Sequence, residues 1–120
     1  MLKKIRLELG RTPEQPDGDP NVAYEIVAPL DRSGHLDAEA WRSHRDRCVV
    51  VHLRPGLPVE QGVLLHRSGN VWAFSYRPGE EDNEPLFKLD HHKFKSGEYI
   101  SITGHDGKQR PFRVVSVDAA

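Results

Sequence analysis

The closing segment of the chain, residues 99–117, constrains the fold more than any other stretch. Two runs rich in β-branched and aromatic residues flank Asp106 and Gly107. An Asp-Gly pair between such runs is a strong signal for a β-hairpin, because glycine readily adopts the left-handed backbone that tight turns need. The segment therefore predicts two antiparallel strands, and it carries no residue pattern that points to a chemical activity.

The register of this hairpin follows from which side chains share a face. A two-residue turn at Asp106–Gly107 would set Ile100 opposite Arg113, so apolar and charged residues would mix on one face. A three-residue loop, His105–Gly107, with its glycine left-handed in a β-bulge, sets Ile100 opposite Phe112 instead. We predict this bulged register.

The bulged register divides the hairpin into two faces. The apolar face consists of Ile100, Ile102, Phe112 and Val114. Arg110 falls on the same face but near the turn, where its guanidinium can reach water. Val115 and Val117 fall on the opposite face. We expect that face to be covered near the strand's end by another sheet, by a helix or by a second subunit.

The composition predicts one soluble domain over residues 1–120. Apolar residues make up 37% of the chain and charged residues 29%, and 120 residues are enough for an independent core. Seventeen basic and eighteen acidic side chains give a net charge of −1. This balance disfavours nucleic acid as a partner without excluding it, because phosphate binding needs a clustered positive field.

The single cysteine and the N-terminus indicate the compartment. Cys48 alone forms no intramolecular disulfide and no multi-cysteine metal site. Charges alternate with apolar residues over 1–9, so no apolar signal-peptide core is present there, and no run reaches membrane-spanning length. We expect a cytoplasmic protein without a membrane partner.

Short apolar runs with a period of two recur along the chain and predict strands. Before the final hairpin, the predicted strands are 2–9, 22–27, 48–53, 63–67, 71–77 and 86–89. One helix is predicted over 38–47, with Asp37 as its N-cap and Leu36 and Trp41 placed as a hydrophobic staple. The predicted fold is mainly β (α+β): a small bent antiparallel sheet, or a partly open barrel or roll, with one short helix.

The strand at 71–77 is the best candidate for a binding surface. Trp72, Phe74 and Tyr76 alternate with smaller residues and so share one face, with Arg67 and Arg77 nearby in sequence. Aromatic rings with a basic rim bind single-stranded nucleic acid in small β folds. Three aromatic rings on one face of a central strand are equally typical of a barrel core, and this alternative is favoured.

The seven histidines raise the alternative of a metal site. The candidate ligands are His66, His91, His92 and His105. The chain lacks the local spacings that metal sites favour, such as two histidines four apart on a helix, so separate strands would have to bring these residues together. Scattered surface or hydrogen-bonded histidines are the favoured interpretation.

Nucleophilic catalysis has little support in the sequence. Cys48 follows the predicted helix, and the C-terminal end of a helix raises the pKa of a thiol, so a packed core thiol is favoured over a reactive one. No Gly-x-Ser-x-Gly pattern and no glycine-rich phosphate loop occurs. The acidic run at 80–84 lacks the ligand spacing of a calcium loop and is interpreted as a solvated loop.

Several segments taken together resemble a small group of uncharacterised bacterial proteins of about this length. The likeness is carried by Ile5, Leu7 and Leu9 and by residues 24–30, 36–41, 97–103, 105–107 and 112–117. It extends over most of the chain, although none of these segments is a specific motif. The resemblance implies one compact bacterial domain and adds no functional residue.

The sequence therefore predicts a non-enzymatic binding or accessory domain. Binding of single-stranded nucleic acid and a metal-dependent enzyme that uses clustered histidines remain as alternatives. No cofactor is predicted. The partner is left open, with a protein partner or self-association as the options.

Overall fold

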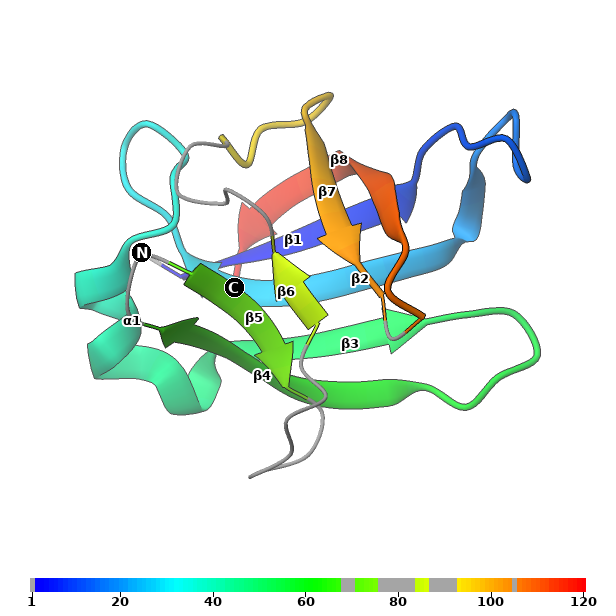
Figure 1. The fold of residues 1–120 in the computed structure, drawn as a ribbon. Coiled ribbons are helices and arrows are strands. Elements are labelled where there is room, and N and C mark those ends of the chain that lie inside the picture. The colour runs from blue at the N-terminus through cyan, green and yellow to red at the C-terminus, as the bar shows by residue number, and fades with distance from the viewer. Residues whose placement is uncertain (1, 68–70, 76–83, 87–92, 105) are drawn as a thin grey trace.

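The computed structural model of this chain describes residues 2–67, 71–75, 84–86, 93–104 and 106–120. In this part of the chain the fold is mainly β, with one short helix, as predicted (Figure 1). The strands are β1 (Leu2–Leu9), β2 (Asp19–Pro29), β3 (Val49–Leu53), β4 (Glu60–Arg67), β5 (Val71–Ser75), β6 (Glu84–Leu86), β7 (Tyr99–Thr103) and β8 (Gln109–Ala119). The helix α1 (Ala38–His44) continues into a short 3-10 turn, η1 (Arg45–Arg47).

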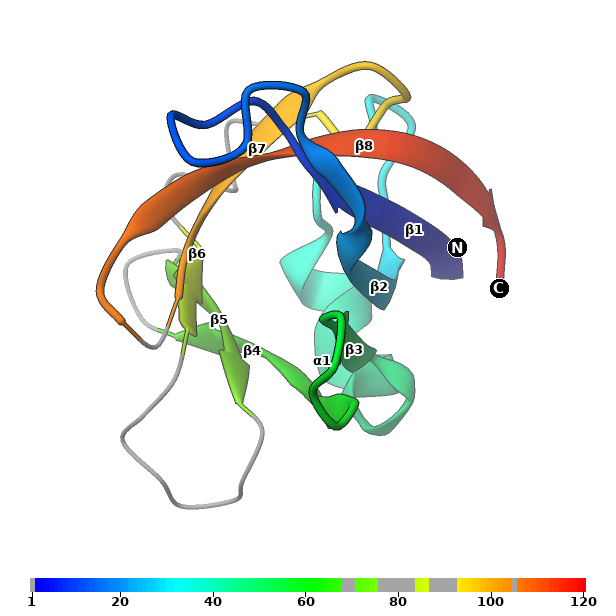
Figure 2. The same ribbon diagram turned by 90° about the vertical axis from the view of Figure 1, so that its right-hand side faces the viewer.

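The strands form a closed antiparallel barrel. Each strand pairs with the next along the chain, and β8 pairs with β1, so that the ring of strands is complete (Figure 2). Ile5 in β1 lies between Ile26 of β2 and Val117 of β8. The predicted fold class, a small bent antiparallel sheet or a partly open barrel or roll with one short helix, is confirmed, and the pairing of β1 with β8 completes the ring of strands. Closure leaves β1 and β8 without an unpaired edge.

The barrel interior is filled by alternate side chains of its strands. In β1, every second residue from Ile5 to Leu9 is buried while the charged residues between them are not, as the sequence pattern predicts. The largest fully buried side chains are Trp72, Tyr24, Phe74, Ile5, Leu7, Leu64, Ile100 and Ile102. Burial of each such side chain contributes roughly 1.5–3 kcal/mol relative to an exposed position.

The final hairpin has the predicted bulged register. Ile100 lies opposite Phe112 in the β7–β8 ladder. The N–H of Gly104 donates to the carbonyl of Lys108 and the N–H of Gly107 donates to the carbonyl of Gly104, each at 3.0 Å. Gly107 has a φ of +79°, the left-handed conformation that the bulge requires.

A second bulge lies in β8 and changes the expected position of Val117. Leu7 lies opposite Val114 but Arg6 lies opposite Ser116, so Val115 is an extra residue in the ladder with β1. This shift returns Val117 to the inner face, where it packs against the core. The bulge therefore brings Val117 against the barrel's own core.

The helix α1 closes one end of the barrel. Its N-cap is Asp37, as predicted, and the carboxylate accepts a hydrogen bond from the N–H of Ala40 at 3.1 Å. Trp41 is buried, and its indole N–H donates to the carbonyl of Leu64 in β4 at 2.9 Å. In Figure 2, which looks from the opposite end, α1 lies behind the ring of strands. Among the described residues, no helix covers the other end of the barrel, which we call its open end.

Candidate functional site

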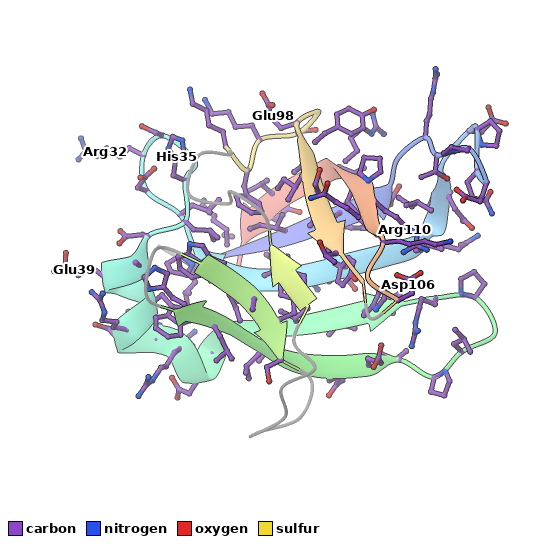
Figure 3. The ribbon with its side chains drawn as sticks, in the orientation of Figure 1. Arg32, His35, Glu39, Glu98, Asp106 and Arg110 are labelled. Atoms are coloured by element: carbon purple, nitrogen blue, oxygen red, sulfur yellow. The ribbon has the colours of Figure 1, made fainter. Side chains whose placement is uncertain are left out.

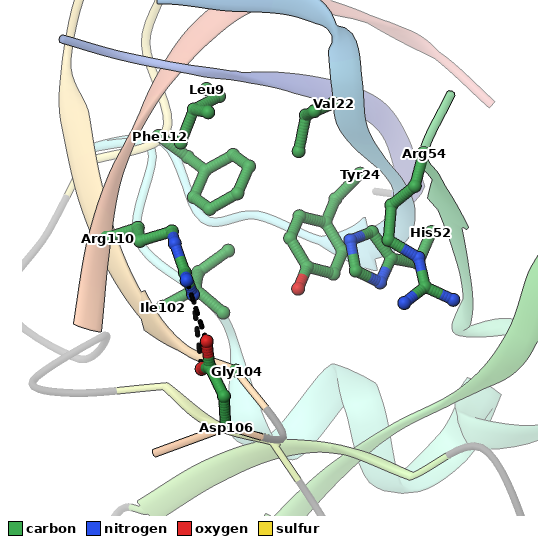
Figure 4. Close-up of a pocket in the computed structure, with 10 residues that line it drawn as sticks. All are labelled: Leu9, Val22, Tyr24, His52, Arg54, Ile102, Gly104, Asp106, Arg110 and Phe112. Carbon is green, nitrogen blue, oxygen red and sulfur yellow. Dashed lines mark hydrogen bonds and ion pairs between the residues drawn. The ribbon is translucent and has the colours of Figure 1, made fainter. Parts of the chain in front are cut away.

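The open end of the barrel contains a cavity of about 370 Å³, which we call the mouth cavity. It lies at the end of the molecule opposite α1, where Asp106 and Arg110 are labelled in Figure 3. Its apolar lining consists of Leu9, Val22, Ile102 and Phe112, and its polar lining of Tyr24, His52, Arg54, Asp106 and Arg110 (Figure 4). The volume lies within the range of about 300–1,000 Å³ that small-molecule sites occupy in proteins.

An aromatic cluster forms one wall of the mouth cavity. Tyr24 of β2 and His52 of β3 are directly opposed in the ladder and both are buried, so both side chains point into the barrel. Their rings stack, with centroids 4.1 Å apart and planes inclined by 8°. Phe112 meets the Tyr24 ring edge-on, with centroids 5.0 Å apart. The wall is therefore pre-formed, and its rings have little freedom to rearrange.

Arg54 lies beside this wall and is held by a carboxylate. Its Nη2 lies 2.9 Å from Oε1 of Glu60, the first residue of β4. The same oxygen lies 3.5 Å from Nδ1 of His52, the ladder partner of Glu60. Nε of Arg54 is buried and has no hydrogen-bond acceptor among the described residues. The carboxylate of Glu60 therefore lies against both the arginine and the histidine.

Arg110 and Asp106 form a second ion pair on the other side of the cavity (Figure 4). The two guanidinium Nη atoms donate to the two carboxylate oxygens at 3.2 and 2.7 Å. The backbone N–H of Lys108 also donates to Oδ1 of Asp106, at 3.0 Å. The hydrogen bond from Arg110, followed by that from Lys108, holds the pKa of Asp106 well below its usual range. Asp106 therefore stays ionised, and both of its oxygens are engaged.

The mouth cavity combines apolar walls with a few polar groups. The described residues that line it include Tyr24, His52 and Asp106 but no cysteine, serine, threonine or lysine. Apolar walls with a few converging polar groups are typical of a site that holds and orients a small molecule.

The structure places the two described aromatic candidates of β5 in the core. Trp72 is 1% exposed and Phe74 is not exposed at all, the arrangement that the sequence favoured. Trp72 packs edge-on against Trp41 of α1, with ring centroids 6.1 Å apart. Tyr76, Arg77 and the side chain of Arg67 lie outside the described residues. Nucleic-acid binding through this strand stays a prediction, and its described rings are occupied in packing.

The histidine candidates are only partly described. His66 is half-buried, and its ring packs against Trp72 with centroids 4.5 Å apart. His91, His92 and His105 lie outside the described residues. In the described part of the chain, no group of three or more histidine, cysteine or acidic residues is arranged to hold a metal ion. The metal site stays a prediction.

Cys48 is a core thiol, as predicted. Its side chain is fully buried, and Sγ donates to the carbonyl of His44 at 3.3 Å. Burial, together with the nearby negative charge of Asp46, raises the pKa of the thiol to about 11. A thiol in this state is a poor nucleophile at neutral pH.

None of the mouth-cavity residues is among the binding candidates predicted from the sequence, although His52 and Arg110 carry a signal. In β3, His52 occupies an inward position of the alternation that also buries Val50. In β8, Arg110 occupies the inward position next to Phe112. Polar side chains at inward positions near strand ends indicate a polar barrel mouth. Their convergence depends on a barrel closure that is not visible in any one segment.

A scan against protein-family models finds no match for this chain, and searches of curated proteins and of solved structures find none either. The functional assignment therefore rests on the geometry of the mouth cavity. Among the described residues, no helix is both long and apolar enough to span a bilayer.

Proposed function

We propose that this protein is a non-enzymatic binding protein that takes up a small, mainly apolar molecule in the mouth cavity. The observation that carries this proposal is a cavity of about 370 Å³ with a pre-formed aromatic wall at the one end of the barrel that the helix does not close. This proposal keeps the binding role predicted from the sequence and moves it from β5 to the barrel mouth.

The apolar lining supplies the driving force. Removal of ligand apolar surface from water contributes roughly 25 cal/mol per Å² before the costs of association are subtracted. Leu9, Ile102 and Phe112 are already packed in the core, so binding does not require them to become ordered. We therefore expect dissociation constants in the micromolar to millimolar range for simple apolar probes.

Fluorescence titration with phenylnaphthylamine (NPN), a neutral apolar dye, tests this proposal. The dye's emission rises when it leaves water, so a saturable rise with one dye per protein is expected. Val22→Trp is the informative variant because Val22 is half-buried and lines the cavity, where a larger ring would occupy the space. This substitution should abolish saturable binding.

Val63→Trp is the matched control. Val63 is 38% exposed on β4 and does not line the mouth cavity, so the same substitution there should leave NPN binding unchanged. Circular dichroism would verify that both variants keep the fold. Equal loss of binding in the two variants, or no saturable binding to the unmodified protein, would overturn the proposal.

A further inference from the structure

The polar groups of the mouth cavity define the charge of its ligand, an inference that rests on the proposed binding function. We infer that the ligand is an amphipathic organic anion, with an apolar body and one carboxylate or sulfonate group, and that Arg54 binds the anionic group. The ligand class follows from a comparison of the free donors and acceptors that face the cavity.

The carboxylate in the described cavity lining is already paired. Asp106 is the one carboxylate among the described residues that line the cavity. It accepts two hydrogen bonds from Arg110 and one from the backbone of Lys108. A cationic ligand would have to compete with this bidentate pair for the same two oxygens. The lining therefore disfavours a cation.

The guanidinium of Arg54 has more N–H donors than its ion pair with Glu60 uses. An arginine has five N–H donors, and in the ion pair of Arg54 with Glu60 its Nη2 lies 2.9 Å from Oε1. Glu60 does not line the mouth cavity, so it holds Arg54 without placing its own charge in the lining. The side chain of Arg54 lines the cavity and is 30% exposed, and its buried Nε is not needed for contact with a ligand. Arg54 can therefore donate hydrogen bonds to an oxyanion while it stays paired with Glu60.

The position of Arg54 fixes the orientation of the ligand. Arg54 follows β3, beside the stacked rings of Tyr24 and His52. Ile102 and Phe112 line the cavity from β7 and β8 (Figure 4). An anionic group at Arg54 would leave the apolar body of the ligand against these side chains. The site thus selects a molecule that is charged at one end and apolar at the other.

Anilinonaphthalene sulfonate (ANS) and NPN provide a matched test, because NPN has the same skeleton without the sulfonate. The measured quantity is the ratio of the ANS affinity to the NPN affinity, in the unmodified protein and in Arg54→Gln. Hydrogen bonds to charged groups contribute about 1.5–3 kcal/mol, so this ratio should fall about tenfold or more in Arg54→Gln. Arg42→Gln, in which an exposed arginine on α1 is changed, should leave the ratio unchanged.

Salt dependence tests the same inference on the unmodified protein, so it does not depend on how Arg54→Gln folds. Between about 20 and about 300 mM sodium chloride, ANS affinity should fall several-fold while NPN affinity stays constant, because salt screens the attraction of the sulfonate. A ratio that is unaffected by Arg54→Gln, or ANS affinity that does not respond to salt, would overturn the anion inference. Saturable NPN binding in that case would leave the proposed function standing, and failure of both dyes to bind would overturn both.

Discussion

Tyr24 and His52 stack face to face at the open end of the barrel, with ring centroids 4.1 Å apart and planes inclined by 8°. They are cross-strand partners in β2 and β3, so the sheet register itself brings the rings together. The pair fills the part of the core next to the mouth cavity and also forms a wall of that cavity. The stability of the barrel and the shape of the site are therefore linked at these two residues.

Two substitutions of His52 should separate two contributions to the free energy of unfolding, that of the stack with Tyr24 and that of the contact with Glu60. His52→Ala removes the ring and leaves a void beside Tyr24, so the free energy of unfolding should fall by about 2 kcal/mol. His52→Phe keeps a ring of similar size and should retain more than half of that stability. Urea unfolding followed by circular dichroism would measure both. Equal losses in the two variants would show that the contact with Glu60 dominates.

Two glycines should differ in their tolerance of alanine. Gly107 has a φ of +79° and open space around the position of a Cβ, so Gly107→Ala should cost only the backbone strain, about 1–2 kcal/mol. Gly18 has a φ of +72°, and a Cβ there would lie 2.5 Å from the carbonyl oxygen of Leu9. Gly18→Ala should therefore destabilise the protein more than Gly107→Ala in urea unfolding. The reverse order would contradict the loop geometry between β1 and β2.

The local parts of this fold could be predicted from sequence. The register of Ile100 with Phe112 follows from the loop length and the glycine, and the helix start follows from Asp37. Both depend on residues a few positions apart along the chain. The burial of Trp72 and Phe74 likewise follows from their alternation in a short apolar strand, where core packing was the favoured interpretation.

The long-range parts could not be predicted in this way. Closure of the barrel depends on the pairing of β1 with β8, and the bulge at Val115 becomes visible only when the partner strand is known. The mouth cavity combines His52 of β3 and Arg110 of β8 with side chains from other strands, and no short pattern joins them. A binding site assembled from strand ends therefore lacks a sequence motif, even where each contributing strand is recognised.

The hydrogen bond from the Trp41 indole to the carbonyl of Leu64 should contribute to the stability of the protein, and a single substitution can remove it. Trp41→Phe keeps an aromatic ring but removes the indole N–H and leaves the carbonyl of Leu64 without that donor. The expected loss is about 1–3 kcal/mol in the free energy of unfolding. Thermal and urea unfolding would both report it. Unchanged stability would show that the indole hydrogen bond makes no net contribution.

Cys48 should make the protein less stable at alkaline pH. The pKa of its thiol is raised from an ordinary value of 9.0 to about 11 in the folded protein, mainly by burial. The thiol ionises first in the unfolded state, so its stabilising effect is complete below pH 9.0 and is lost as the pH rises towards about 11. Compared with Cys48→Ala, the unmodified protein should lose stability over this interval. Parallel pH profiles for the two proteins would contradict this prediction.

The most direct test of the central claim is the location of a bound probe. Amide N–H correlation spectra recorded during titration with NPN would place the dye by residue. We expect the largest shifts at Val22, Arg54 and Gly104, which line the mouth cavity, and none in α1 at the closed end. Shifts centred on the amides of Val49 and Val63, whose side chains are exposed on the outer wall of the barrel, would contradict the claim.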